Sequence, residues 1–80
     1  MSEEFRKDLI RLVSEKKEQA RQTVRRWREK AWADLQEGFR EGKIREDDKY
    51  KGKDKLQELI DEYNKKIEEL AEKKKKEIIE

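Results

Sequence analysis

The sequence predicts an all-α protein, a long antiparallel helical hairpin that resembles a coiled coil. Three observations favour this fold class. Apolar residues recur at spacings of three, four and seven along two long segments. The 80 residues include no proline, so little interrupts a helix. The clearest helix stop, Gly42, lies near the middle of the chain. Since a short turn joins the two predicted helices, they must run antiparallel.

The first helix is predicted over residues 3–41. Ser2 is a suitable N-cap, and Glu3 and Glu4 place negative charge in the first turn, where the helix dipole favours it. Lys16 shares the apolar stripe, where its methylene groups can cover apolar surface. The stripe predicts that Trp27 lies in the core. Its apolar members are Phe5, Leu9, Val13, Ala20, Val24, Trp27, Ala31 and Leu35.

The predicted turn covers residues 42–45. Gly42 fits the left-handed position after a helix end, and Ile44 can make the apolar contact that often accompanies this stop. Glu46, Asp47 and Asp48 follow at the start of the second helix. Three adjacent acids also resemble a cation site, but they lack the alternating oxygen ligands and central glycine of a calcium loop. We therefore interpret them as favourable charges at a helix start.

The second helix is predicted over residues 46–79. Gly52 is unfavourable inside a helix and predicts fraying or a bend. The run from Lys73 to Lys76 could bind lipid or nucleic acid, but nearby glutamates favour a solvated last turn. The apolar stripe of this segment consists of Leu56, Leu59, Ile60, Tyr63, Ile67, Leu70, Ala71 and Ile78.

The composition limits the size of the core. Only 31% of residues are hydrophobic and 55% are charged, so we expect one small helical domain over residues 1–80. One partner helix cannot cover all the remaining apolar side chains. Self-association or a helical partner is therefore expected to complete a three- or four-helix bundle. The side chains that require such cover are Phe5, Ile10, Trp32, Phe39 and Ile79.

Several functional classes are disfavoured by what the chain lacks. It has no cysteine and no histidine, so disulfides, thiolate metal sites and the usual general base near neutral pH are absent. No nucleophile motif or phosphate-binding glycine loop is present. We expect no catalytic residue, metal, cofactor or small-molecule substrate. No apolar run approaches the length of a membrane span or a signal sequence, so we expect a cytoplasmic protein without a membrane partner.

A cluster of positive charge gives the most specific functional indication. The formal net charge is only +2, but residues 16–30 contain seven basic and two acidic residues, a net charge of +5. At about 100° per residue, Arg21, Arg25, Arg28 and Trp32 fall on a different face from the apolar stripe. Guanidinium groups in such a row can hold RNA phosphates while an indole stacks on an unpaired base. A solvated arginine row on an ordinary amphipathic helix is the alternative.

Four segments resemble the helical domain of bacterial ribosome recycling factors. Residues 2–9 (SEEFRKDL) resemble the family's T-E-E-R-R-K/R-D/E-L, and residues 18–28 (EQARQTVRRWR) resemble its E-Q/E-A-R/K segment and the arginine-rich segment that follows. Residues 42–48 (GKIREDD) are similar to its turn. Residues 56–67 and the lysine-rich end are similar to its last helix. The resemblance extends over essentially the whole chain in order.

The resemblance implies a part of a domain that lies along large-subunit ribosomal RNA and cooperates with elongation factor G to split the ribosome after termination. It assigns Arg25 and Arg28 to RNA-facing positions and Arg21 to a commonly basic position one turn earlier. The first helix of the family's three-helix bundle and its second domain have no counterpart here.

Four positions depart from the family pattern. Glu29 stands in place of an arginine, and a glutamate there repels phosphate. Arg26 and Trp32 each replace an asparagine, and Arg45 replaces a serine that would cap the second helix. These departures and the high charge also fit an alternative. The chain would then be a designed or resurfaced structural hairpin that self-associates or binds a protein and has no native translation function.

Overall fold

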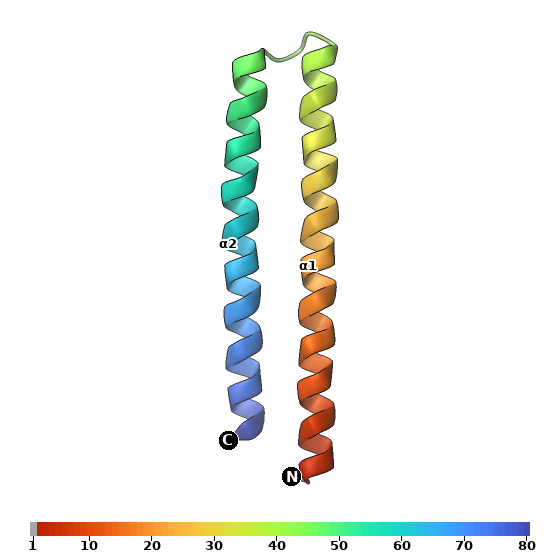
Figure 1. The fold of residues 1–80 in the computed structure, drawn as a ribbon, viewed down its shortest axis with the longest axis vertical. Coiled ribbons are helices and arrows are strands. Elements are labelled where there is room, and N and C mark those ends of the chain that lie inside the picture. The colour runs from red at the N-terminus through yellow and green to blue at the C-terminus, as the bar shows by residue number, and fades with distance from the viewer. Residues whose placement is uncertain (1) are drawn as a thin grey trace.

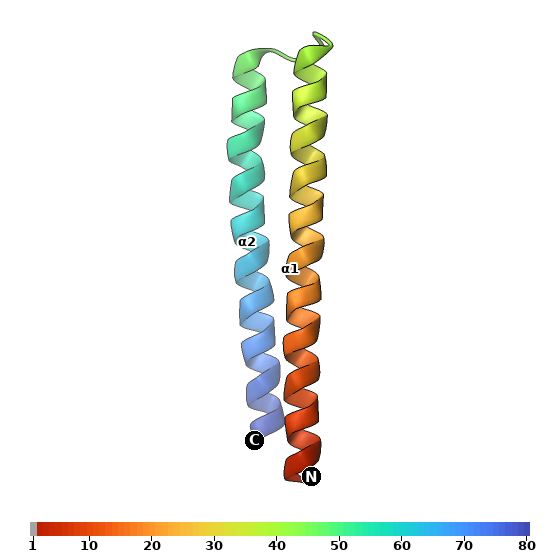
Figure 2. The same ribbon diagram turned by 45° about the vertical axis from the view of Figure 1, so that its right-hand side comes forward.

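The structure is a computed structural model that describes residues 2–80. It consists of two long helices, α1 (Glu3–Arg40) and α2 (Glu46–Ile79), which lie side by side and run antiparallel (Figures 1 and 2). The molecule measures 60 × 15 × 9 Å along its principal axes. The start of α1 and the end of α2 lie at the end of the rod opposite the turn (Figure 1). The predicted all-α antiparallel hairpin is confirmed. Its completion into a bundle stays a prediction.

Helix α1 begins with the predicted cap. Ser2 has an extended backbone conformation, and its hydroxyl oxygen accepts a hydrogen bond of 3.2 Å from the Phe5 N–H. Glu3 and Glu4 lie in the first turn, where the free N–H groups of the helix start favour negative charge. The local sequence therefore accounts fully for where α1 starts.

The turn between the helices follows the geometry that Gly42 predicts. Gly42 has a φ of 75°, a backbone conformation that residues with a Cβ atom rarely adopt. Its N–H donates to the Phe39 carbonyl at 3.0 Å, and the Lys43 N–H donates to the Gly38 carbonyl at 2.8 Å. These two bonds form a Schellman motif, which satisfies carbonyl groups at the end of α1. Ile44 then folds back over Gly38.

Helix α2 starts less favourably than α1. Arg45 occupies the N-cap position and makes no side-chain hydrogen bond to the helix start. Glu46, Asp47 and Asp48 lie in the first turn, as expected for charges that interact with the helix dipole.

The expected bend at Gly52 is wrong, because α2 continues through this residue. A Cβ atom at position 52 would stand 3.0 and 3.1 Å from the two methyl carbons of Leu35. The missing side chain of Gly52 therefore lets α1 approach α2 closely near the turn. The glycine serves the packing of the two helices and does not interrupt α2.

The seam between the helices forms a thin core. Only Leu56, Ile60 and Ala71, all on α2, are buried among the described residues. Partly buried residues of α1 recur mainly at spacings of three and four, as in a coiled-coil seam, and four of them are charged. The partly buried residues of α1 are Arg6, Leu9, Ile10, Val13, Lys17, Ala20, Arg21, Val24, Arg28, Ala31, Trp32, Leu35 and Gly38.

The predicted core position of Trp27 is wrong. Its side chain is 49% exposed and makes an edge-to-face contact with Tyr63, with ring centroids 6.4 Å apart. The neighbouring Arg28, rotated by about 100° around the helix, lies closer to the seam. Since a hairpin has only two helices, a residue beside the seam remains open to solvent. Trp27 therefore lies on a lateral face of the hairpin.

Candidate nucleic-acid interface

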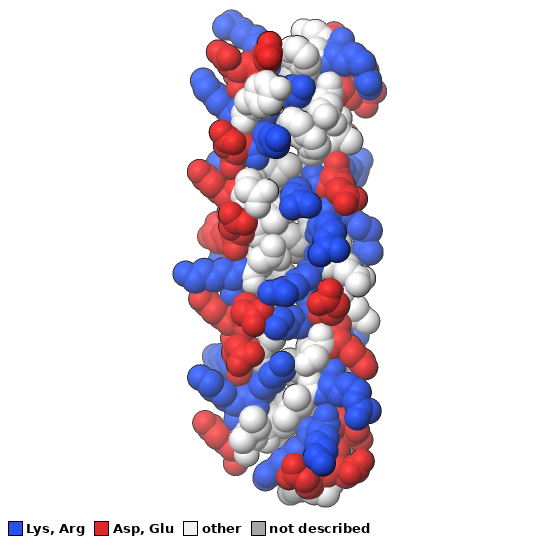
Figure 3. All heavy atoms as spheres, in the orientation of Figure 1, with Lys and Arg blue, Asp and Glu red and all other residues white. Residues whose placement is uncertain are grey.

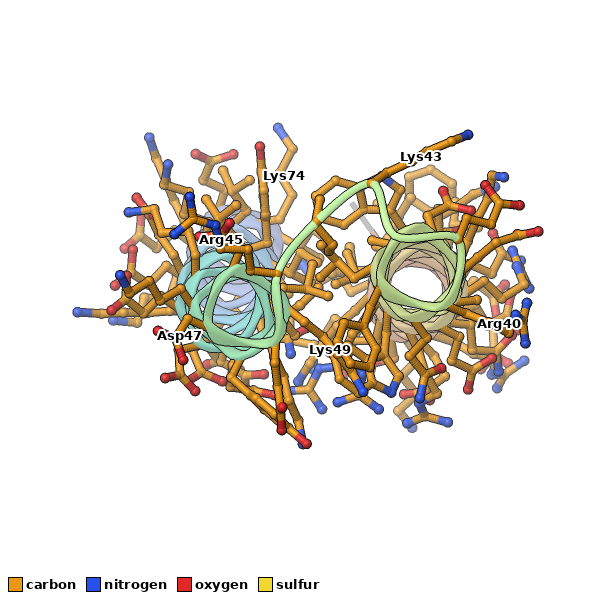
Figure 4. The ribbon with its side chains drawn as sticks, turned by 90° about the horizontal axis from the view of Figure 1, so that it is seen from above. Arg40, Lys43, Arg45, Asp47, Lys49 and Lys74 are labelled. Atoms are coloured by element: carbon orange, nitrogen blue, oxygen red, sulfur yellow. The ribbon has the colours of Figure 1, made fainter. Side chains whose placement is uncertain are left out.

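The hairpin has two lateral faces of different chemistry. Figure 4 places Lys49 and Lys74 on opposite sides of the two helices. On the side of Lys49 lies what we call the basic face, formed by Arg21, Arg25, Arg28, Trp32, Lys49 and Lys53. Figure 3 views this side and shows Lys and Arg side chains gathered over the middle of the seam. On the side of Lys74 lies the apolar face, represented by Leu12, Ala20, Ala31, Leu35, Leu59 and Leu70.

The three arginines of the predicted row line one pocket. This pocket has a volume of about 290 Å³ and is lined by Arg21, Arg25 and Arg28 of α1 and by Asn64 of α2, among others. Arg25 is exposed, whereas Arg21 and Arg28 are partly buried. The arginine row thus runs along the edge of the seam, closer to α2 than the helical periodicity alone indicates.

Arg21 is held by an ion pair between the helices. Its guanidinium lies 2.8 Å from a carboxylate oxygen of Glu68, and the Lys17 ammonium lies 2.9 Å from the same carboxylate. The hydrogen bond from Lys17, together with the charges of Lys17, Arg21 and Lys75, lowers the pKa of Glu68 below its ordinary value. Glu68 thereby neutralises part of the positive charge at this end of the row.

Arg25 and Arg28 are the less constrained members of the row. Within residues 2–80, no carboxylate oxygen lies within 4.0 Å of either guanidinium group. Both side chains therefore keep their donors for another acceptor. A guanidinium presents its N–H groups as a planar fork, which matches two oxygens of one phosphate.

Trp32 lies at the end of the row nearer the turn, and two lysines of α2 contact its ring. The ammonium groups of Lys53 and Lys49 lie 5.0 and 5.6 Å from the ring centroid. A second pocket, of about 260 Å³, is lined by Trp32, Lys53, Arg28 and three further residues. Because Arg28 lines both this pocket and the arginine pocket, the two are neighbours on the basic face.

Lys49 and Lys53 belong to the basic face, but the sequence pattern did not identify these two residues as part of the candidate site. They lie four residues apart on α2, and the antiparallel turn brings that segment opposite Trp32 and Phe39. Lysines spaced four apart are common on solvated helices, so the spacing carries little information by itself. The relevant signal is their position relative to the turn, which fixes which residues of the two helices face each other.

The described residues provide neither a metal-binding cluster nor a membrane span. No group of three or more acidic residues between Ser2 and Glu80 lies close enough to hold a metal ion. The helices of this part of the chain are too polar to cross a bilayer. The arrangement on the basic face is instead one of cations and an aromatic ring. Such a surface binds anions and planar groups.

Comparison with known proteins identifies the family. A family model described as "Ribosome recycling factor" matches residues 1–79. Ribosome-recycling factors of Shouchella clausii and Rubrobacter xylanophilus are each 41% identical over 80 residues, and that of Halothermothrix orenii is 38% identical over 80 residues. In all three cases the match covers the whole chain and 43% of the relative. No solved structure matches the chain. The chain belongs to the ribosome recycling factor family.

Proposed function

We propose that this chain is a non-catalytic helical module that contacts ribosomal RNA phosphates of the large ribosomal subunit through Arg21, Arg25 and Arg28, with Trp32 beside the row. The observation that carries this proposal is the position of Arg25 and Arg28. Both line one pocket, and neither has a carboxylate partner within the described part of the chain. Guanidinium groups free of internal ion pairs are suited to bind the RNA backbone.

The three arginines contribute unequally in this proposal. Arg21 is already paired with Glu68, so a phosphate must compete with that carboxylate. Glu29 lines the pocket beside Trp32 and repels phosphate there. The path for an RNA strand therefore follows the α2 side of the row, past Asn64 and Lys53, and avoids Glu29.

Family membership supports the class of function. Ribosome recycling factors are translation factors and not enzymes, so the chain is a non-catalytic member of a family that acts on the ribosome. The chain spans less than half the length of the relatives it matches. Complete recycling together with an elongation factor is accordingly a proposal for a longer protein. We propose the cytoplasm as the site of action, since that is where bacterial ribosomes work.

A cosedimentation experiment with large ribosomal subunits tests the arginine face. The Arg25→Ala/Arg28→Ala variant should bind at least about 100-fold more weakly than the original chain, because two charge-assisted hydrogen bonds of about 1.5–3 kcal/mol each are lost. An Arg26→Ala/Lys30→Ala variant is the matched control. It loses the same charge from exposed positions of the same helix, outside both pockets. Equal losses in the two variants would show a general charge effect and would contradict the proposal.

The apolar face favours a second candidate function, in which the hairpin associates with another copy or with a helical partner. Two pockets of about 360 and 440 Å³ lie along this face, lined mainly by apolar residues. Leu70 and Trp27 are 66% and 49% exposed. Exposed apolar surface of this kind marks protein interfaces.

Sedimentation equilibrium with a Leu70→Glu variant tests this candidate. Self-association predicts a mass above 9.9 kDa for the original chain and a monomer for the variant. A folded monomer at all concentrations, before and after the substitution, would contradict self-association.

A further inference from the structure

A cluster of aromatic rings and lysines surrounds the end of the basic face nearest the turn. The Lys49 ammonium lies 4.9 Å from the ring centroid of Phe39, 5.2 Å from that of Tyr50 and 5.6 Å from that of Trp32. Lys53 lies 5.0 Å from the Trp32 ring. Two ammonium groups of α2 therefore contact one indole of α1, and Figure 4 shows Lys49 reaching between the helices. This arrangement places positive charge beside a planar apolar surface.

The pocket beside Trp32 has the size and chemistry of a site for one nucleobase. Its volume is about 260 Å³, and Leu56 and Trp32 supply apolar walls. Glu29 also lines it, so the phosphates of a bound strand must lie on the Lys53 side, away from this carboxylate. Gln57 adds an amide whose nitrogen donates one hydrogen bond to Asp61 at 2.9 Å, which leaves its carbonyl oxygen and second N–H for a base edge. Arg28 lies at the boundary with the arginine pocket. A strand held by the arginines would thus continue directly to the indole.

We propose that Trp32 stacks on one unpaired base of an RNA strand, while Lys49 and Lys53 hold the phosphates on either side of that base. This inference rests on the proposed RNA contact of the arginine row and specifies the unit of RNA that is recognised. Stacking on an aromatic side chain requires a base that is not paired. The ligand is therefore a single-stranded or looped segment and not a regular duplex.

The two lysines do not prevent stacking. Trp32 is partly buried, and a lysine contact with such a ring is comparable in strength to one stacked base, so a base can replace the ammonium only if the lysine gains a phosphate in exchange. The lysine side chain is long and flexible, and the displaced ammonium stays within reach of the neighbouring phosphate. In the absence of RNA, the same lysines hold the indole in place. The site is therefore partly preorganised.

Fluorescence anisotropy with labelled RNA tests the proposal on the whole chain. The probes are a single-stranded oligouridylate, the same oligomer with abasic positions, and a duplex RNA of equal length. Trp32→Leu keeps apolar bulk against the lysines but removes the stacking surface, and it should weaken binding of the oligouridylate about 5- to 100-fold. Trp32→Phe restores an aromatic face and should recover most of the affinity.

Two controls separate stacking from a structural role of the indole. Trp27→Leu removes the other indole, which lies outside the basic face, and should leave RNA binding unchanged. The abasic oligomer and the duplex should bind the original chain and the Trp32→Leu variant equally. Helix content measured by circular dichroism should be the same for all variants.

The outcomes distinguish this inference from the proposed function. If Trp32→Leu binds oligouridylate as well as the original chain, while Arg25→Ala/Arg28→Ala loses binding, the base site is wrong and the arginine contact stands. If Trp32→Leu weakens the binding of duplex and single-stranded RNA equally, the indole only supports the packing of the hairpin, and the base site is again wrong. If the original chain binds no RNA at all, both proposals are wrong.

Discussion

Replacement of Gly52 by alanine tests the close packing of the helices near the turn. Alanine inside a helix is about 0.5–1 kcal/mol more favourable than glycine. The added Cβ would stand 3.0 and 3.1 Å from the methyl carbons of Leu35, which is too close without movement. The atoms in the way belong to a side chain and not to the backbone. The sign of the effect therefore depends on whether Leu35 can move.

The structure indicates that Leu35 has room to move. It lines a pocket of about 440 Å³ on the apolar face, so a shift of a few tenths of an ångström meets open space. A side chain displaced well away from its preferred rotamer costs about 0.5–1.5 kcal/mol, and this smaller shift should cost only a fraction of that. We expect Gly52→Ala to stabilise the hairpin by about 0.5 kcal/mol. The melting temperature should rise by roughly 2–4 °C.

Thermal unfolding followed by circular dichroism measures this effect. Gly38→Ala is the matched control, because its Cβ would meet Ile44 at an ordinary contact distance of 3.6 Å. It should give the full gain of about 0.5–1 kcal/mol. A lower melting temperature for Gly52→Ala together with a higher one for Gly38→Ala would refute the reasoning. Leu35 would then be fixed, and the hairpin would require glycine at position 52.

Three further predictions concern the turn, the start of α2 and the ion pair. Gly42→Ala should lower stability in a urea titration by about 1–2 kcal/mol, because its φ of 75° is unfavourable for alanine. Unchanged stability would contradict this. Arg45→Ser should raise stability by about 1 kcal/mol, because it supplies the missing side-chain cap. A melting temperature that does not rise would count against it. Since the folded state lowers the pKa of Glu68, this group stabilises the fold above its unfolded pKa. That contribution should disappear as the pH falls below about 4.5 and through the lowered pKa, and Glu68→Gln should remove this part of the pH dependence. Equal acid sensitivity of both chains would contradict it.

The sequence predicts the elements of the fold because their ends depend on local chemistry. Ser2 caps α1, and Gly42 ends it through a left-handed backbone conformation. Both signals act over three or four residues. The hairpin follows from two long amphipathic segments joined by a short turn.

The exact residues of the seam are harder to predict than the helices. Apolar side chains on α1 are divided between the seam and the apolar face, so their average direction lies between the two. This explains why the pattern places Trp27 in the core, whereas the structure places Arg28 nearer the seam. It also explains why Lys17, and not Lys16, reaches across to Glu68.

The site is only partly predictable for a related reason. Helical periodicity brings the arginines and Trp32 to one side of α1, and the structure places all four along one edge of the seam. Contacts across the hairpin depend on which residues of α1 and α2 face each other. The pair between Arg21 and Glu68 and the contacts of Lys49 and Lys53 with Trp32 are of this kind.

Directed cleavage of ribosomal RNA tests most directly whether the basic face meets the large subunit. The chain has no cysteine. A single cysteine can therefore be introduced, and an iron chelate that generates hydroxyl radicals can be attached to it. Asp61→Cys places it one turn along α2 from Gln57, beside the basic face and outside both of its pockets. Thr23→Cys, about 200° around α1 from Arg25, places it away from the arginine row. We predict strong cleavage of large-subunit RNA from position 61 and little from position 23. Equal cleavage from both positions, or stronger cleavage from position 23, would contradict the account.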